Sequence, residues 1–184
     1  MVSTMNVPDL LPEQIARISG LVAQYIRAQQ DAYRANGVSL SNAQKEAMRG
    51  FFSEDTLERV QLVTLAKARV GNPDFYPMLR GLGFNNLIDF SQMAAITFEN
   101  VIVSHETFSN RLLFHELVHV EQYHQLGVNR FADLYVRGFL AGGGYDGIPL
   151  ETEAYTLDES FHHAPTCRFD VAAEVARGIA ANRL

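Results

Sequence analysis

The sequence is poor in cysteine and in positive charge, and each shortage excludes a class of protein. Its 184 residues include a single cysteine, Cys167, which can neither form an internal disulfide nor build a cysteine-rich metal site. Fifteen lysines and arginines stand against 21 acidic residues, which leaves a formal net charge of −6. This charge has the wrong sign for a surface that binds the phosphates of nucleic acid. We therefore expect no nucleic-acid partner.

Long apolar runs are also missing. No stretch reaches the ~18 consecutive apolar residues that a membrane span requires, and residues 1–14 lack the basic start and apolar run of a signal peptide. These absences predict a cytoplasmic protein with no membrane partner. The length predicts a single domain, residues 1–184, whose core is large enough to fold without a structural metal.

Most of the chain has helical periodicity. Asp9 and Pro12 are typical of a helix start, and the apolar spacing that follows predicts a helix to about Ala35. Further helices are predicted at residues 42–48, 109–126, 129–140, 149–161 and 171–182, with a short turn after Ser53. We interpret residues 1–56 as a helical amino-terminal region and residues 57–184 as a metallopeptidase-like core.

Two segments favour strands over helices. Residues 60–65 alternate as a strand would, although a helix also fits them. Residues 95–98 and 101–104 are rich in β-branched and aromatic residues on either side of Glu99 and Asn100, which predicts a hairpin or one bent strand. The predicted fold class is therefore α+β and mostly helical, with a small sheet whose edge strand packs near the helix at 109–126.

That helix contains two histidines and a glutamate in a reactive spacing. His115 and His119 are four residues apart, so both imidazoles project from one face, about one turn apart. Two imidazoles so placed can bind one Zn²⁺, and Glu116 can take a proton from a zinc-bound water. This HExxH pattern is typical of zinc hydrolases. Apolar residues flank it on most sides, which predicts a buried helix whose polar groups need partners.

A catalytic zinc of this type takes a third protein ligand. No histidine stands where an extended HExxHxxGxxH motif would place one. His124 lies about 140° round the helix from His119 and is predicted to be solvated. The better candidates are two glutamates of the helix at 149–161. Glu153 falls within the apolar stripe of that helix and is predicted to be the third ligand, with Glu151 as the alternative.

The motif and the segment before it resemble a known family. Residues 94–103, followed by His115–Gln122, are similar to metallopeptidase domains of the HExxH zincin type. Among these are the domains of unknown function found with bacterial contractile injection systems, which read A-x-T-x-x-x-x-I-x-F and then HELTHVxQ. The likeness covers about residues 57–125. Residues 151–154 also resemble the acidic helix of gluzincins, in which a glutamate completes the zinc site.

The resemblance implies roles for particular residues. It assigns His115 and His119 as zinc ligands and Glu116 as the catalytic base. It also assigns residues 96–103 as the edge strand that aligns a peptide by strand addition. The chain departs from the pattern at Glu121, where many relatives have an apolar or aromatic residue.

These observations predict a zinc-dependent hydrolase, a peptidase that acts on a peptide or protein substrate. Tyr155 is the donor we select to stabilise the developing oxyanion, and Tyr145, His162 and His163 are further candidates. Two alternatives stay open, a zinc enzyme with a non-peptide substrate and a zinc-containing scaffold that binds a partner without hydrolysis. Glu116 argues against the scaffold, because a structural zinc site needs no base.

Overall fold

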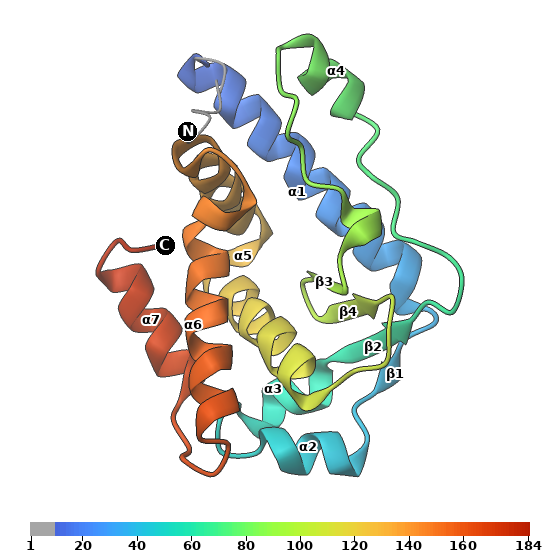
Figure 1. Cartoon of the computed structure of the whole chain (residues 1–184), viewed down its shortest axis with the longest axis vertical. Coiled ribbons are helices and arrows are strands. Elements are labelled where there is room, and N and C mark those ends of the chain that lie inside the picture. Colours follow the sequence, from blue (N-terminus) through green and yellow to red (C-terminus); the bar gives the residue numbers. More distant parts are fainter. Residues whose placement is uncertain (1–9) are drawn as a thin grey trace.

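The computed structural model describes residues 10–184 and shows an α+β fold that is 61% helical (Figure 1). Its helices are α1 (Pro12–Arg34), α2 (Asn42–Met48), α3 (Glu54–Arg59), α4 (Tyr76–Gly81), α5 (Asn110–Gly142), α6 (Pro149–His163) and α7 (Val171–Ala180). Short 3₁₀ turns occur at Phe90–Gln92 and Tyr145–Gly147. The predicted helix starts at Ser41, Ser53 and Ser109 are confirmed, since each serine side chain accepts a backbone N–H as an N-cap. The predicted start at Asp9 lies outside the described residues.

A four-stranded mixed sheet forms beside the helices. Its strands are β1 (Val38–Ser39), β2 (Gln61–Thr64), β3 (Ala95–Phe98) and β4 (Val101–Ser104), in the order β1-β2-β4-β3. β3 and β4 form the predicted hairpin, and β2 confirms the predicted strand at 60–65 by pairing in parallel with β4. Of the two hairpin strands only β3 lies at an edge of the sheet, because β4 lies between β2 and β3. The prediction of one edge strand over residues 96–103 is therefore wrong for its second half.

α5 is the central helix, and it packs against α1, α6, α7 and β3 (Figure 1). A cluster of phenylalanines fixes α5 to α6. The ring of Phe114 stacks on that of Phe161 at 4.4 Å between centroids, and Phe51 meets both rings edge-on at 5.3 Å. Phe114 directly precedes His115, so this apolar contact sets the register in which α6 faces the histidines.

Gly127 divides α5 into two segments, as the two helices predicted at 109–126 and 129–140 require. Its backbone angles, φ 70° and ψ 158°, lie outside the helical region and are open essentially only to glycine. The kink returns the second segment toward the first, so that the ring of Phe131 stacks on Tyr123 at 3.8 Å. This return brings Tyr135 toward the amino-terminal half of α5.

No helix within residues 10–184 combines the length and the apolar character that a membrane crossing demands.

Two glycine-to-alanine substitutions test the kink. Gly127→Ala should lower the free energy of unfolding by roughly 1–3 kcal/mol, because alanine is strained at this backbone conformation. Gly20→Ala is the matched control, because Gly20 lies inside α1 and a Cβ at either glycine would meet open space. It should raise the free energy of unfolding by about 0.5–1 kcal/mol, since alanine favours the helix interior. Urea denaturation measures both, and a stabilising Gly127→Ala would contradict the strained kink.

Candidate metal centre

The first segment of α5 presents two buried imidazoles on one face. His115 and His119 are 7% and 6% exposed, with ring centroids 5.0 Å apart. They are buried because the apolar side chains around them, among them Leu117 and Val118, hold this part of α5 in the core. The predicted pairing of the two histidines on one helical face is confirmed.

A carboxylate from α6 completes the cluster, and it belongs to Glu151. Its Oε2 atom lies 3.6 Å from His115 Nε2 and 3.4 Å from His119 Nε2. One ligand atom from each of the three buried residues lies within 4.8 Å of the other two, so the group could hold a metal ion. Ligands about 2.0–2.1 Å from a tetrahedral ion are separated by about 3.3 Å, which is close to both distances to the carboxylate. The donor set therefore fits a metal centre.

The other ring nitrogen of each histidine is already held by a buried acceptor. His115 Nδ1 lies 3.0 Å from Asp158 Oδ2, and His119 Nδ1 lies 2.8 Å from Gln122 Oε1. A neutral imidazole that donates from Nδ1 has its lone pair on Nε2, the nitrogen that faces Glu151. The surroundings thus orient both rings as metal ligands.

Two tyrosines orient Glu151 in the same way. Tyr145 donates its hydroxyl to Glu151 Oε2 at 2.7 Å, and Tyr135, from beyond the kink, donates to Oε1 at 3.2 Å. Burial would raise the pKa of the Glu151 carboxyl, but the neighbouring histidines and the Tyr145 hydroxyl lower it well below its usual range. Glu151 is therefore an anion in this buried setting.

The charges of the cluster call for a positive partner. Burial lowers the pKa of His115, but its hydrogen bonds to Asp158 and Glu151 outweigh burial and raise it to about 10. The carboxylate of Glu151 also raises the pKa of His119 against burial. Both shifts favour the protonated imidazoles, whose protons offset the charge of the buried carboxylates. A bound cation would replace those protons and supply the same positive charge.

Glu116 lies beside the cluster with its carboxylate held by the edge strand. The residue is 4% exposed, and its Oε2 accepts a hydrogen bond from Thr97 Oγ1 of β3 at 2.7 Å. A cleft of about 430 Å³ reaches His115 and Glu116 from the surface. Its polar lining also includes Tyr155, Asp158 and Arg111. Glu116 therefore combines burial with access to a cleft that a substrate can enter.

The structure does not bring Glu153, the predicted third ligand, to the histidines. Glu153 is half-buried on a different side of α6, where its Oε2 accepts a hydrogen bond from Gln122 Nε2 at 3.1 Å. Burial raises the pKa of this carboxyl. The prediction that Glu153 falls within the apolar stripe of α6 is wrong, because the buried residues of this helix include Glu151 and not Glu153. The two glutamates lie on opposite flanks of the stripe, and the packing of α6 turns the Glu151 flank toward α5. Glu153 instead supports His119 indirectly, through Gln122.

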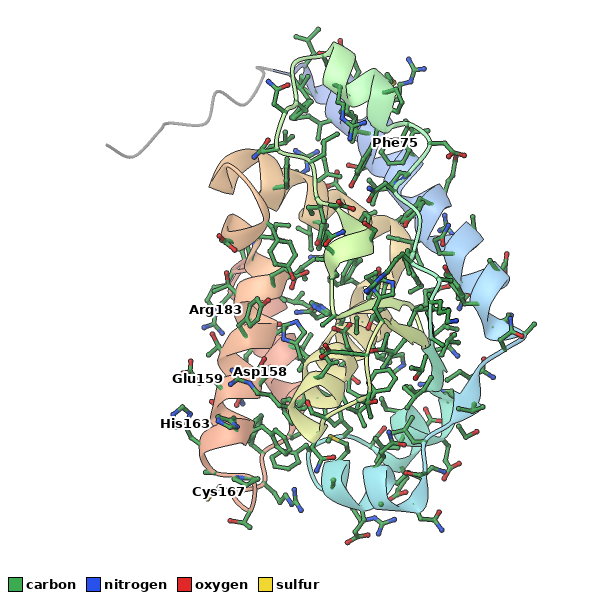
Figure 2. All side chains as sticks on the ribbon, turned by 45° about the vertical axis from the view of Figure 1, so that its right-hand side comes forward. Phe75, Asp158, Glu159, His163, Cys167 and Arg183 are labelled. Atoms are coloured by element: carbon green, nitrogen blue, oxygen red, sulfur yellow. The ribbon has the colours of Figure 1, made fainter. Side chains whose placement is uncertain are left out.

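Of the proposed oxyanion donors, Tyr155 is the one that lies at the cleft with a half-exposed side chain. Its ring centroid is 4.6 Å from that of His115. Tyr145 donates to Glu151. His162 and His163 are exposed at the carboxyl end of α6, and Figure 2 labels His163 there. The role of Tyr155 stays a prediction. His124 is exposed, as predicted.

The residues that orient the ligands were not predicted from the sequence. Asp158 follows Glu151 by seven residues, two helical turns, and so lies on the same face of α6. Gln122 follows His119 by three residues on α5, which is the spacing of its hydrogen bond. Both spacings were visible in the sequence. Nothing local in the sequence indicates Thr97 or Tyr135, because each reaches the site through the tertiary fold.

Comparison of the chain with models of protein families, with curated proteins and with solved structures gave no match.

Paired glutamine substitutions test the ligand set. Glu151→Gln should weaken binding of added Zn²⁺ by more than about 100-fold, a larger loss than removal of an outer partner causes. Glu153→Gln is the matched control on the same helix and should change the affinity by less than about tenfold. Competition against a chromophoric chelator measures both. A larger loss in Glu153→Gln would mean that the wrong glutamate has been placed beside the histidines.

Asp158 offers a test of the imidazole orientation. Asp158→Asn should weaken Zn²⁺ binding by about 10–100-fold, because the amide is a poorer acceptor for His115 Nδ1. Glu159, its exposed neighbour on α6, provides the control Glu159→Gln, which should bind as the unmodified protein does (Figure 2). The same chelator competition measures both variants, and equal affinities would show that Asp158 does not orient the ligand.

Proposed function

We propose that this protein is a zinc-dependent hydrolase of peptide bonds, with the HExxH and glutamate arrangement of a gluzincin. The observation that carries the proposal is the joint placement of His115, His119 and Glu151 beside the buried carboxylate of Glu116. His115 and Glu116 also open into the surface cleft. The site therefore offers a ligand set, a base and access for substrate in one place.

The donor chemistry supports zinc. Imidazole nitrogen and carboxylate oxygen are ordinary zinc ligands, and two histidines with one glutamate form a known catalytic set. Structural zinc sites have four protein ligands, whereas three leave one coordination position for chemistry. When bound, zinc would supply a Lewis acid that polarises the substrate carbonyl and makes water more acidic.

Glu116 is the residue that would move the proton. Thr97 holds one carboxylate oxygen, Oε2, and leaves Oε1 to accept a proton from the attacking water. Hydrolysis adds this water across the C–N bond, so the carbonyl carbon gains the hydroxyl and the leaving amine receives the proton through Glu116. Tyr155, half-exposed beside His115, would donate to the developing oxyanion.

β3 supports a peptide as the substrate. It is one of the two edge strands of the sheet, and its residue Ala95 lines the cleft together with Glu116. An extended peptide that pairs with an edge strand is held by main-chain hydrogen bonds, which fixes its register independently of sequence. Such pairing would direct a backbone carbonyl toward the metal ligands.

Glu116→Gln separates the hydrolase from the zinc-containing scaffold. The variant should keep about one zinc per chain while losing about 10²–10⁴-fold in the rate of peptide cleavage, because an amide cannot accept the proton. Glu121→Gln is the matched control, since Glu121 is also buried on α5 but bonds to Gln125 away from the cluster. It should cleave at the unmodified rate.

Metal analysis and a peptide library measure these outcomes. A protein that binds no zinc would contradict the metal site. Bound zinc with no Glu116-dependent hydrolysis would favour the scaffold.

A further inference from the structure

Two apolar pockets adjoin each other beside the candidate metal centre, and together they are called the passage here. A pocket of about 70 Å³ is lined by His115, Glu116, His119 and Glu151 at one end and by apolar side chains of α1 and β3 beyond them. A second pocket of about 80 Å³ continues from it. Each pocket is several times the ~10–15 Å³ that one water molecule needs.

The two pockets meet at a neck of four shared residues, Val22, Tyr25, Phe90 and Tyr135. The far pocket lies between α1, the second segment of α5 and the segment around α4, where Phe75 forms part of its wall (Figure 2). Together the two adjoining pockets extend from the ligand cluster into the apolar interior, with aromatic rings among the residues where they adjoin.

Beyond the cluster, the described residues of the far pocket provide no available hydrogen-bonding side chain for a polar ligand. All the described residues around the far pocket are apolar or aromatic. The hydroxyls of its tyrosines are already used, since Tyr25 donates to Gly71 O at 2.7 Å and Tyr76 to Ile88 O at 2.8 Å. Tyr135 likewise donates to Glu151. These side chains present ring faces to the passage, and an occupant with polar groups along its length would lose their hydration without compensation.

The passage extends along the two helices that line it. On α1 the lining moves from Val22 and Ile26 at the near pocket to Ile18 at the far one, and on α5 it moves from Phe131 to Phe139. Each shift is at least one helical turn, about 5–6 Å. A side chain that begins at the cluster would fill the near pocket, whereas an occupant of both pockets must be a longer linear chain that passes the neck.

The opposite side of the cluster is polar and open. The cleft of about 430 Å³ shares His115, Glu116 and Tyr145 with the near pocket, and it adds Arg111 and Asp158. The ligand cluster thus borders both the apolar passage and a more polar cleft. A substrate that matches this asymmetry has an apolar chain on one side of its scissile bond and a polar group on the other.

We propose that the substrate is an amide whose acyl part is a long, unbranched apolar chain, with the chain in the passage and the amine part in the cleft. The inference rests on the proposed hydrolase activity and gives its substrate an apolar acyl chain, with any peptide portion confined to the amine part in the cleft. Hydrolysis adds water across the C–N bond, releases a carboxylic acid that keeps the apolar chain, and returns the amine with the second proton. The cluster borders the near pocket, so a chain attached to the reacting carbonyl enters the passage directly.

Binding of neutral N-methyl amides to the metal-free protein tests the passage without relying on catalysis. Calorimetry across unbranched acyl chains of about four to about twelve carbons should show affinity rising up to about fourfold per methylene until both pockets are filled. A chain of equal carbon number that ends in a tert-butyl group should bind at least about tenfold more weakly, because the neck excludes it. Equal affinity along the series, or equal affinity of the branched chain, would overturn the proposal.

Substitutions at the neck locate the effect. Val22→Phe should reduce the affinity for the longest chain by more than about tenfold and leave the shortest chains little changed, since the larger ring closes the neck. Val38→Phe is the control, because Val38 is 64% exposed on β1 and lines neither pocket. An identical loss for both variants would also overturn the proposal. If Val22→Phe does not fold, the calorimetric series of acyl-chain lengths on the unmodified protein still tests the proposal.

The outcomes distinguish the two proposals. Flat affinities in a protein that binds zinc and needs Glu116 for cleavage would overturn the acyl-chain substrate and leave the hydrolase intact. A clear chain-length dependence in a protein that binds no zinc would support the passage as an apolar binding site and overturn the hydrolase.

Discussion

The packing of α5 against α6 depends on buried carboxylates that require a positively charged partner. Glu151 and Asp158 extend from α6 into the core, where they face His115 and His119 of α5. Carboxylates removed from water are costly unless a cation or a proton-bearing partner compensates them. The raised pKa values of the two imidazoles favour protonated rings that do so, and a metal ion would do so when bound. The contact between α5 and α6 is therefore electrostatic at its centre and apolar around it.

The apolar surroundings make that contact specific. Phe114 and Phe161 stack directly beside the cluster and fix the register of the two helices. The kink at Gly127 then brings Tyr135 back to hold Glu151, and β3 brings Thr97 to Glu116. Each polar group of the site is held by an element whose own position depends on core packing, which preorganises the cluster before any ligand arrives.

The same packing gives the site two unlike sides. α1 and the second segment of α5 enclose apolar space that reaches the ligands, while Arg111 and Asp158 border a solvated cleft. The zinc chemistry proposed for the cluster is common to many hydrolases, so the shapes on its two sides decide which bonds it meets. This asymmetry is a property of how the helices are arranged around the sheet.

The sequence by itself determined the local features. Serine caps located helix starts, β-branched runs located the hairpin, and the spacing of His115 and His119 placed both rings on one face, because these follow from interactions within a few residues. The identity of the third metal ligand, a glutamate of α6, did not follow from such local interactions. Glu151 and Glu153 flank the same apolar stripe, and the periodicity of α6 cannot say which flank meets α5. Only tertiary packing decided it, as it decided the contacts of Thr97 and Tyr135, because helix orientation is set by contacts between residues distant in sequence.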